Sequence, residues 1–288
     1  MIPDLAFHRP ATIGEACALS RTLGPAAAFL AGGTELLPDF HRGRESARHL
    51  IALNRIAELH GITEGDDGLH IGALVTLAEV AASPQVQSIL PALATAALAV
   101  GSAQVRSVAT IGGNVCRAVS CADLPPVLIA AEGWLRLIGT NGERTLPLEH
   151  FLLGARKTAL EWGEMLVEVV VPHQPRGSGA EYERFARRRG SSLAVAAVAA
   201  RVTLTRDRIG GARITLGAVA PAPLLVAAAA ELLEGAQPSD ALFDQAARLC
   251  AAAALPISDL RGSAAFRHEL VAVLTRRALT GACARAVR

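Results

Sequence analysis

Apolar and polar positions along the first part of the chain predict a small unit of helix and strand. Residues Ile13 to Leu23 have the spacing of an amphipathic helix. An apolar strand is expected from Ala26 to Ala31, where the pair Gly32-Gly33 ends it, and another from His49 to Leu53. These elements form a small α+β unit that closes near Ile56.

The middle part of the chain has the pattern of hairpins with short helices between them. The Asp66-Asp67-Gly68 segment and the Asn141-Gly142 pair each predict a hairpin turn. Thr76 and Glu79 have the spacing of a capping box, which indicates the start of a helix. The other expected elements are strands near Gly61–Thr63, Leu69–Ile71, Trp134–Ile138, Glu143–Leu146 and Met165–Val171, helices that restart at Pro84 and Pro91 and run to about Val100, a break at Gly112-Gly113, and a helix from Leu124 to Ala131.

The segment His173 to Ala180, with the sequence HQPRGSGA, is the strongest domain boundary that the composition offers. Strands are expected after it, and helices follow the strands, which is typical of an α+β domain and not of a parallel βαβ array. The expected strands are Glu181–Ala186, Ala194–Thr205 and Ala212–Val219, and the expected helices lie near Leu224–Leu233, Asp240–Ala254 and Ser263–Leu279.

Composition and charge narrow the function classes. Hydrophobic residues make up 51% of the 288 positions and charged residues 19%, so the chain can bury a sizeable core. The net charge is +2, and the only basic run is Arg187-Arg188-Arg189, which is too short for a nucleic-acid footprint. The longest uncharged window, Val80 to Val105, carries prolines and glutamines and is a poor membrane span. The N-terminus lacks a secretory pattern, and five cysteines without regular spacing indicate reduced thiols in the cytoplasm.

The sequence lacks the motifs of several common enzyme classes. It has no P-loop, no GxGxxG, no GxSxG and no HExxH. The eight histidines are isolated from one another, so no metal ligand set is expected. A self-contained hydrolase or metalloenzyme is therefore disfavoured.

Two segments with paired glycines remain as candidates for binding chemistry. The first is Phe29 to Glu35 (FLAGGTE) and the second is Ser107 to Asn114 (SVATIGGN). Paired glycines let the backbone turn so that successive N–H groups converge on an anion, and Thr34 or Asn114 adds a side-chain donor. Two such loops could hold a pyrophosphate from both sides. Each pair also fits a plain tight turn, which is the commoner use of Gly-Gly.

Four longer strings carry a family resemblance over nearly the whole chain: LAGGTELLP, GALVTLAEV, QVRSVATIGGNVCRAVSCADLPPVLIA and SDLRGSAAFRHELVAVLTRRAL. They resemble the FAD-binding (medium) subunit of the molybdenum hydroxylases, the xanthine dehydrogenase and carbon monoxide dehydrogenase flavoprotein family. The resemblance implies an FAD domain of the vanillyl-alcohol-oxidase (PCMH) type at residues 1–176, made of subdomains at about 1–56 and 57–176. It implies a C-terminal domain with a small antiparallel sheet and helices at residues 177–288.

The family's FAD contacts can be carried to matching positions of this chain. The resemblance assigns the pyrophosphate to the first glycine segment, and the phosphates and ribityl chain to the second. Asp123 matches an acidic FAD contact, although an N-cap before Pro125 is the alternative. Leu166, or its neighbour Val167, matches an apolar position near the flavin, and a core strand residue is the alternative. The residues of the two segments are Ala28, Phe29, Leu30, Ala31, Gly32, Gly33, Thr34 and Glu35, and Thr110, Ile111, Gly112, Gly113 and Asn114.

The chain departs from the family at several positions. Arg184 stands where many relatives carry a lysine near the flavin. Its planar guanidinium spreads the charge over several donors, so the single contact that a lysine ammonium makes to the flavin is not expected to be reproduced. Ser191-Ser192 stands where relatives often have an acidic pair. The chain has no insertion of the kind that carries an extra iron–sulfur cluster in one branch. Cys116 and Cys121 are accordingly expected to be buried small side chains and not ligands.

The function implied by the resemblance is electron transfer. Electrons would pass from the [2Fe-2S] clusters of a small partner subunit through FAD to NAD+, a quinone, O2 or a protein acceptor. A large partner subunit with the molybdenum cofactor would oxidise the substrate, and the assembly would be a dimer of heterotrimers. No catalytic side chain is expected, because the flavin carries the chemistry. The alternatives are a self-contained flavin oxidoreductase and an assembly subunit that has lost FAD.

Overall fold

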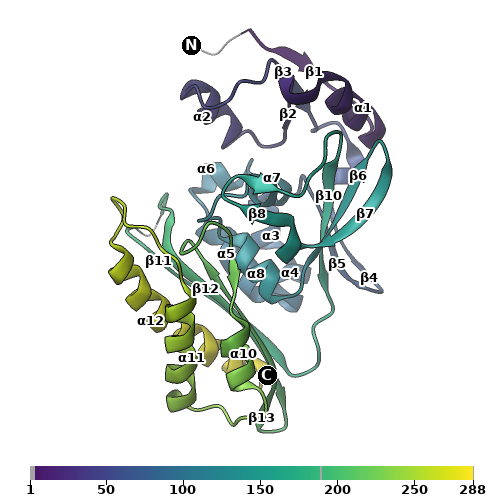
Figure 1. Ribbon diagram of the computed structural model, residues 1–288. Helices are drawn as coiled ribbons and strands as arrows, with labels where there is room; N and C mark the ends of the chain where they lie inside the picture. The colour runs from purple at the N-terminus through teal and green to yellow at the C-terminus, as the bar shows by residue number, and fades with distance from the viewer. Residues whose placement is uncertain (1–3, 189, 288) are drawn as a thin grey trace.

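The computed structural model describes residues 4–188 and 190–287, which form an α+β protein with a separate main sheet in each of three successive parts of the chain (Figure 1). The first part holds a three-stranded parallel sheet in the order β1-β3-β2, so β2 is an edge strand. Its elements are β1 (Ala6–His8), α1 (Ile13–Leu23), the 3₁₀ helix η1 (Gly24–Ala26), β2 (Ala27–Leu30), α2 (Leu36–His41), β3 (His49–Ala52) and the 3₁₀ helix η2 (Ala57–Leu59).

Local signals account for the first helix. Thr12 caps α1 by accepting a hydrogen bond from the Glu15 amide, and Gly24 ends the helix with a positive φ of 56°. The buried side of α1, including Ala16 and Cys17, packs with Ile51 of β3 in one small core. The predicted helix over Ile13–Leu23 is confirmed.

The second part is built on a five-stranded antiparallel sheet in the order β4-β5-β10-β6-β7, with short helices packed beside it (Figure 1). Both predicted hairpins are present, and Thr76 and Glu79 form the predicted capping box. The strands are β4 (Ile62–Gly65), β5 (Gly68–Gly72), β6 (Trp134–Gly139), β7 (Gly142–Pro147), β8 (Leu152–Gly154), β9 (Lys157–Thr158) and β10 (Met165–Pro172). The helices are α3 (Leu77–Ala82), α4 (Pro84–Ile89), α5 (Pro91–Ala99), α6 (Ala103–Arg106), α7 (Ile111–Cys116), α8 (Leu124–Ala130) and α9 (Leu148–Phe151).

One predicted feature of this part is wrong. The Gly112-Gly113 pair does not break the chain, because both glycines lie inside helix α7. Thr110 caps this helix by accepting from the Gly113 amide, and an isolated bridge between Thr76 and Thr110 fixes its start. A cap and a tertiary contact thus override the low helix propensity of the two glycines.

The third part is a four-stranded antiparallel sheet in the order β11-β12-β13-β14 with three helices on one side (Figure 1). Several bounds differ from expectation, and β11 and β13 begin at Ser178 and Arg208 instead of Glu181 and Ala212. Leu224 and Leu225 form a strand paired with β13 and not a helix start. The last helix continues past Leu279, and Ala282 and Cys283 of its later turns are buried in the same core as Leu279. The elements are β11 (Ser178–Ala186), β12 (Ala194–Thr205), β13 (Arg208–Gly217), β14 (Leu224–Leu225), α10 (Ala227–Leu233), α11 (Asp240–Ala253) and α12 (Ala264–Ala286).

Strand β12 is buried on both faces and joins the second and third parts of the chain. Ala197 and Ala199 belong to the core that surrounds helices α5 and α8, whereas Ala196 and Val198 belong to the core under α11 and α12. This explains its nearly unbroken run of alanine and valine, since no residue at its centre faces water. Among the described residues, no helix is both long and apolar enough to cross a membrane.

Candidate functional site

The first glycine segment forms a turn with unused backbone donors. It connects the edge strand β2 to helix α2, and Gly33 adopts the left-handed φ of 69°. Within residues 4–188 and 190–287, the amides of residues 31 to 36 donate no hydrogen bond. Buried or half-buried N–H groups are normally paired, and successive unpaired ones form an anion-binding nest. This segment therefore offers a cradle of N–H groups for an anion.

Gly32 brings this segment against the second one. A Cβ atom on Gly32 would overlap the carbonyl oxygen of Val108, which lies two residues before the helix cap Thr110. Only glycine allows such a close approach of two backbones. The two glycine segments, far apart in the sequence, are therefore in direct contact.

The second segment does not offer the amide cradle that its sequence suggested. The Ile111 amide donates to the Val75 carbonyl (2.9 Å) and the Gly112 amide to the Ala73 carbonyl (2.9 Å). The Gly113 amide donates to the Thr110 hydroxyl (3.0 Å), and the Asn114 amide closes the first helical turn. The expectation that these N–H groups converge on an anion is wrong, because the protein itself uses all of them.

The second segment can still contact a bound molecule through the side chain of Asn114 and at the exposed position of Gly113. The Asn114 Oδ1 atom is buried, and no described residue bonds it. Gly113 is exposed, and a Cβ there would meet only the Thr110 hydroxyl, at 3.0 Å. On the facing segment, the Thr34 hydroxyl makes no hydrogen bond within the described parts of the chain. These polar groups remain available to a bound molecule.

A buried ion cluster that the sequence analysis missed holds the two segments together. Asp39 of α2 is fully buried and pairs with Arg117, the residue after α7, and with Arg156 Nη1 at 2.7 Å. Burial and the Arg156 charge lower the pKa of Arg117, against the charge of Glu35. An aspartate inside the apolar string LLPDF was the one signal for this cluster in the sequence.

Asp123 lies in a second buried cluster, at the junction with the C-terminal sheet. Its Oδ1 accepts hydrogen bonds from the Tyr182 hydroxyl (2.7 Å) and from Arg184 Nη1 (2.8 Å). The N-cap alternative is wrong, because Asp123 has helical φ and ψ and caps no amide of α8. Burial raises the pKa of Asp123, against the Arg184 charge and the hydrogen bonds from Tyr182 and Arg184.

Arg184 also bridges three segments of the chain. Besides Asp123, it donates to the carbonyl of Ala99 (2.9 Å) and, through Nη2, to the carbonyl of Ser192 (2.8 Å). Such a planar fork, bonded on several sides, is held in one orientation. The guanidinium therefore positions Asp123 and the start of β12.

Leu166 is a core residue in this structure, and Cys116 and Cys121 are half-buried side chains that pack against the same core. Leu166 is buried in the core of the second part, opposite Leu137 of β6, and a bulge turns Val167 toward the neighbouring small core. Cys116 packs against the main core, and burial raises the pKa of its thiol to about 12. Among the described residues, no group of three or more His, Cys, Asp or Glu could hold a metal.

The predicted site residues thus fall into separate places. The first segment, with Phe29 and Leu30 on the edge strand, meets the second segment at Gly32. Asp123 and Arg184 are joined to each other at the start of the C-terminal sheet. The paired glycines made the two segments recognisable in the sequence. Tyr182 and Asp39, which form the buried clusters beside them, belong to no sequence motif.

Comparison with known proteins decides the family. Residues 3–174 match the family described as the FAD binding domain in molybdopterin dehydrogenase, and residues 180–282 match the CO dehydrogenase flavoprotein C-terminal domain. The chain belongs to the FAD-binding subunits of the molybdenum hydroxylases. It is an oxidoreductase flavoprotein subunit with an FAD domain followed by a C-terminal domain.

Individual relatives of this family match over their full length. The chain is 37% identical to the carbon monoxide dehydrogenase medium chain of Hydrogenophaga pseudoflava over 283 residues, which cover 98% of each chain. It is 31% identical to the putative xanthine dehydrogenase FAD-binding subunit of Escherichia coli K12, covering 99% and 98%. The solved carbon monoxide dehydrogenase from H. pseudoflava superposes with a TM-score of 0.96 over 99% of each chain.

The donor set of this chain fits the cofactor of the family. An FAD pyrophosphate is an anion that needs several N–H donors, and the amides of residues 31 to 36 are unpaired within the described residues. Asn114 adds a buried polar atom without a partner. The cofactor's phosphates thus match what the protein leaves unsatisfied.

Proposed function

We propose that this flavoprotein transfers electrons inside a multi-subunit molybdenum hydroxylase. It receives electrons from the [2Fe-2S] clusters of a small partner subunit and passes them to a terminal acceptor such as NAD+, a quinone or O2. A large partner subunit carries the molybdenum cofactor, where the substrate is oxidised. The observation that carries the FAD part of this proposal is the row of unpaired amides at residues 31 to 36.

The proposed roles of the residues follow from what each has available. The amides after Ala31, with the hydroxyl of Thr34, hold the pyrophosphate, and Gly32 keeps the second segment close. Asn114 bonds the cofactor through its side chain, and Gly113 leaves room for it. The other positions assigned to the cofactor are Ala28, Phe29, Leu30, Ala31, Gly33, Glu35, Thr110, Ile111, Gly112, Asp123, Leu166 and Arg184.

The cofactor and the protein have different chemical roles. FAD supplies the electron-transfer chemistry when bound, and the chain's residues bind and orient it. Asp123, Tyr182 and Arg184 hold the junction between the FAD domain and the C-terminal sheet in one arrangement. No side chain has to act as an acid or base on an organic substrate.

The assembly belongs to the same proposal. We place the FAD domain at residues 1–176, with subdomains at 1–56 and 57–176, and the C-terminal domain at 177–288. The separate sheets and the short connection between β10 and β11 support these bounds. Two copies each of the large, medium and small subunits form the complex, which is cytoplasmic and binds no nucleic acid.

The test is the cofactor content of the complex co-purified with its partners. Flavin is released with acid and identified by chromatography, and iron and molybdenum are measured in the same sample. We expect FAD at one per medium subunit, together with both metals. FAD without partners or metals would favour a self-contained flavoenzyme, and a folded complex without flavin would favour the assembly-subunit alternative.

Variants connect the flavin to the first segment. Gly32→Ala should abolish FAD retention, and Thr34→Val, which keeps the side-chain shape, should lower it without changing the fold. Gly14→Ala is the matched control, because a Cβ there meets nothing within 4 Å. Normal retention in both Gly32→Ala and Thr34→Val would refute the assignment of the pyrophosphate to this segment.

A further inference from the structure

An unbalanced charge lies in the ion cluster that joins the two glycine segments. Asp39 is fully buried, and Arg117 and Arg156 both pair with its Oδ2 atom. Within residues 4–188 and 190–287, neither arginine pairs with a second carboxylate. Two positive charges thus share one negative charge. A charge that is shielded from water is costly without a counter-charge, so the cluster favours an anion beside it.

Arg117 carries most of this imbalance. Its side chain is 24% exposed, against 43% for Arg156, so water screens its charge less. Burial, and after it the charge of Arg156, lowers the pKa of Arg117. The Nε atom of Arg117 is buried and bonds no described residue. This guanidinium therefore keeps an unused donor and a charge that Asp39 only partly offsets.

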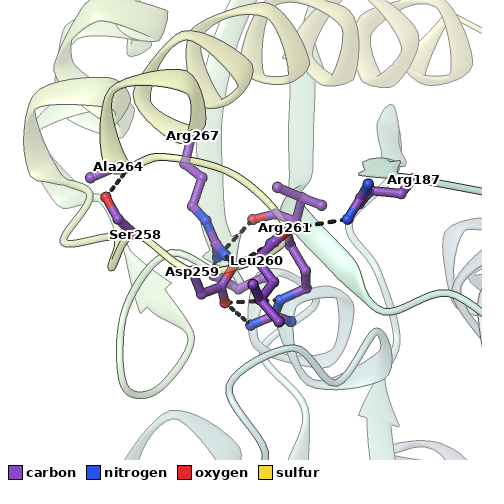
Figure 2. A network of polar contacts seen from close by, with 9 residues as sticks. Arg187, Ser258, Asp259, Leu260, Arg261, Ala264 and Arg267 are labelled. Atoms are coloured by element: carbon purple, nitrogen blue, oxygen red, sulfur yellow. Dashed lines mark hydrogen bonds and ion pairs between the residues drawn. The ribbon is translucent and has the colours of Figure 1, made fainter.

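A second aspartate shared by two arginines shows how the protein balances such a cluster elsewhere. Figure 2 shows Arg261 and Arg267 converging on Asp259, whose Oδ2 accepts from Arg261 and whose Oδ1 accepts from Arg267, at 2.6 Å each. Arg267 also donates to two backbone carbonyls (3.2 and 3.1 Å). Both arginines keep one buried nitrogen without a partner among the described residues, so such an atom does not by itself indicate an anion site.

The Asp39 cluster lacks this compensation and lies beside an anion cradle. Its two arginines use the same carboxylate oxygen, and Oδ1 bonds no described residue. The Arg117 side chain donates to no backbone carbonyl within the described parts of the chain. Helix α2, which carries Asp39, begins directly after the unpaired amides of the first glycine segment. The surplus charge and the free amides thus favour the same anion.

Arg117 also lies near residues of both segments that are assigned to the cofactor. It follows α7 with helical φ and ψ, three residues after Asn114, so the two side chains lie on the same side of this helix. The Asn114 Oδ1 atom is buried and unpaired as well. From the first segment, the charge of Glu35 opposes the lowering of the Arg117 pKa, so Glu35 is close enough to interact with the guanidinium.

We infer that Arg117 binds the pyrophosphate of FAD, as a charged contact in addition to the amides of residues 31 to 36. The inference rests on the proposed function, since it assumes FAD in this chain. Asp39 is a positioning residue that holds the guanidinium from α2. Backbone amides offer single hydrogen bonds, whereas a guanidinium adds a full charge and can bond two phosphate oxygens at once.

The test measures FAD binding to the complex co-purified with its partners, after the flavin has been removed. FAD is titrated back, and its fluorescence gives the Kd. Arg117→Gln should raise the Kd at least about tenfold, because a charge-assisted hydrogen bond is lost. Arg117→Lys keeps the charge but not the planar fork and should recover part of the affinity. Added salt should weaken FAD binding less in Arg117→Gln than in the original chain, because one charged contact is missing.

Two controls separate a phosphate contact from a purely structural role. Arg156→Gln removes the other arginine of the same aspartate and should raise the Kd by less than about threefold, because Arg156 is more exposed. Arg213→Gln removes an arginine that is 21% exposed and pairs with Glu132 and Glu149, and it should leave the Kd unchanged. Thermal unfolding of each flavin-free variant shows whether the fold is intact.

The outcomes distinguish this inference from the proposed function. An original complex that contains no FAD would refute the proposed function itself. If the original complex contains FAD and Arg117→Gln binds it equally well, the inference is wrong while the proposed function stands. Equal losses in Arg117→Gln and Arg156→Gln, or an unchanged salt dependence in Arg117→Gln, would mean that Arg117 only joins the two segments, and would also overturn the inference.

Discussion

The two glycine pairs of this chain have similar sequences and opposite structural roles. At Gly32-Gly33, the chain turns through a positive φ, and the following amides bond no acceptor among the described residues. At Gly112-Gly113, the chain is helical, and each amide has an acceptor within the protein. The first pair supplies donors, whereas the second supplies close packing and one open position.

The difference shows that a Gly-Gly pair is not a binding motif by itself. What decides its use is whether the protein already satisfies its amides, which depends on residues distant in the sequence. Gly112 is a glycine because the Ala73 backbone lies against it, and Gly32 because the Val108 carbonyl does. The contact at Gly112 fixes the start of α7, and the contact at Gly32 places the first segment against the residues just before that start.

The largest effect is expected from breaking the ion cluster that joins the segments. Asp39→Ala should lower the free energy of unfolding by about 3–5 kcal/mol, because it leaves Arg117 and Arg156 without their buried partner. It should also lower FAD retention, although Asp39 is assigned no cofactor contact. Denaturant unfolding and flavin content measure both effects.

An exposed ion pair is the control for this variant. Asp244→Ala removes the partner of Arg276, at 3.2 Å on the surface, and should change stability by less than about 1 kcal/mol. If Asp39→Ala were as mild as Asp244→Ala, the cluster would not be what holds the two segments together.

A smaller effect should separate the two glycines of the second segment. In Gly112→Ala, the new Cβ would lie 2.6 Å from the Ala73 carbonyl oxygen, and a loss of about 1–3 kcal/mol is expected. In Gly113→Ala, the new Cβ would meet only the Thr110 hydroxyl, at 3.0 Å, at an exposed position, and a side-chain hydroxyl can shift more easily than a backbone carbonyl, so stability should stay within about 1 kcal/mol of the original. We expect Gly113→Ala nevertheless to retain less FAD, because the cofactor would fill that space.

Thermal unfolding and flavin content, measured on both variants, sharpen the comparison. Each variant is the other's control, since the substitution is the same at neighbouring positions. Full FAD retention in Gly113→Ala would mean that position 113 does not face the cofactor, and the buried Asn114 Oδ1 would then be the polar side-chain atom that this segment still offers to it.

Local signals in the sequence predicted the elements, but not the way in which they meet. The hairpin at Asn141-Gly142 and the capping box at Thr76 were correct because a few adjacent residues determine them. The helix at Gly112 was missed because its start depends on the bridge from Thr76 to Thr110. The partner of Asp123, Tyr182, is 59 residues away, and spacing alone gives no signal for such a contact.

The smallest change in stability is expected from a variant of the capping box that supports the bridge between Thr76 and Thr110. Glu79 accepts from the Thr76 amide (2.7 Å) and donates its own amide to the Thr76 hydroxyl (3.2 Å), so the capping box holds the residue that pairs with Thr110. Glu79→Gln keeps the shape of the box and removes the charge. A loss of about 1 kcal/mol or less is expected at neutral pH.

The pH dependence identifies the charge as the cause. Hydrogen bonds from Thr76, together with the charge of His60, lower the pKa of Glu79 in the folded protein, against the effect of burial. Its contribution to stability is therefore complete above the ordinary glutamate pKa of about 4.3 and is lost as the pH falls through the lower folded value. The stability difference between Glu79→Gln and the original chain should be constant from neutral pH down to that range and then shrink. Glu231→Gln, on the exposed side of α10, should show no such trend. A difference that grows as the pH falls would mean that the glutamate charge opposes the cap, and that the second glycine segment is held by its backbone bonds alone.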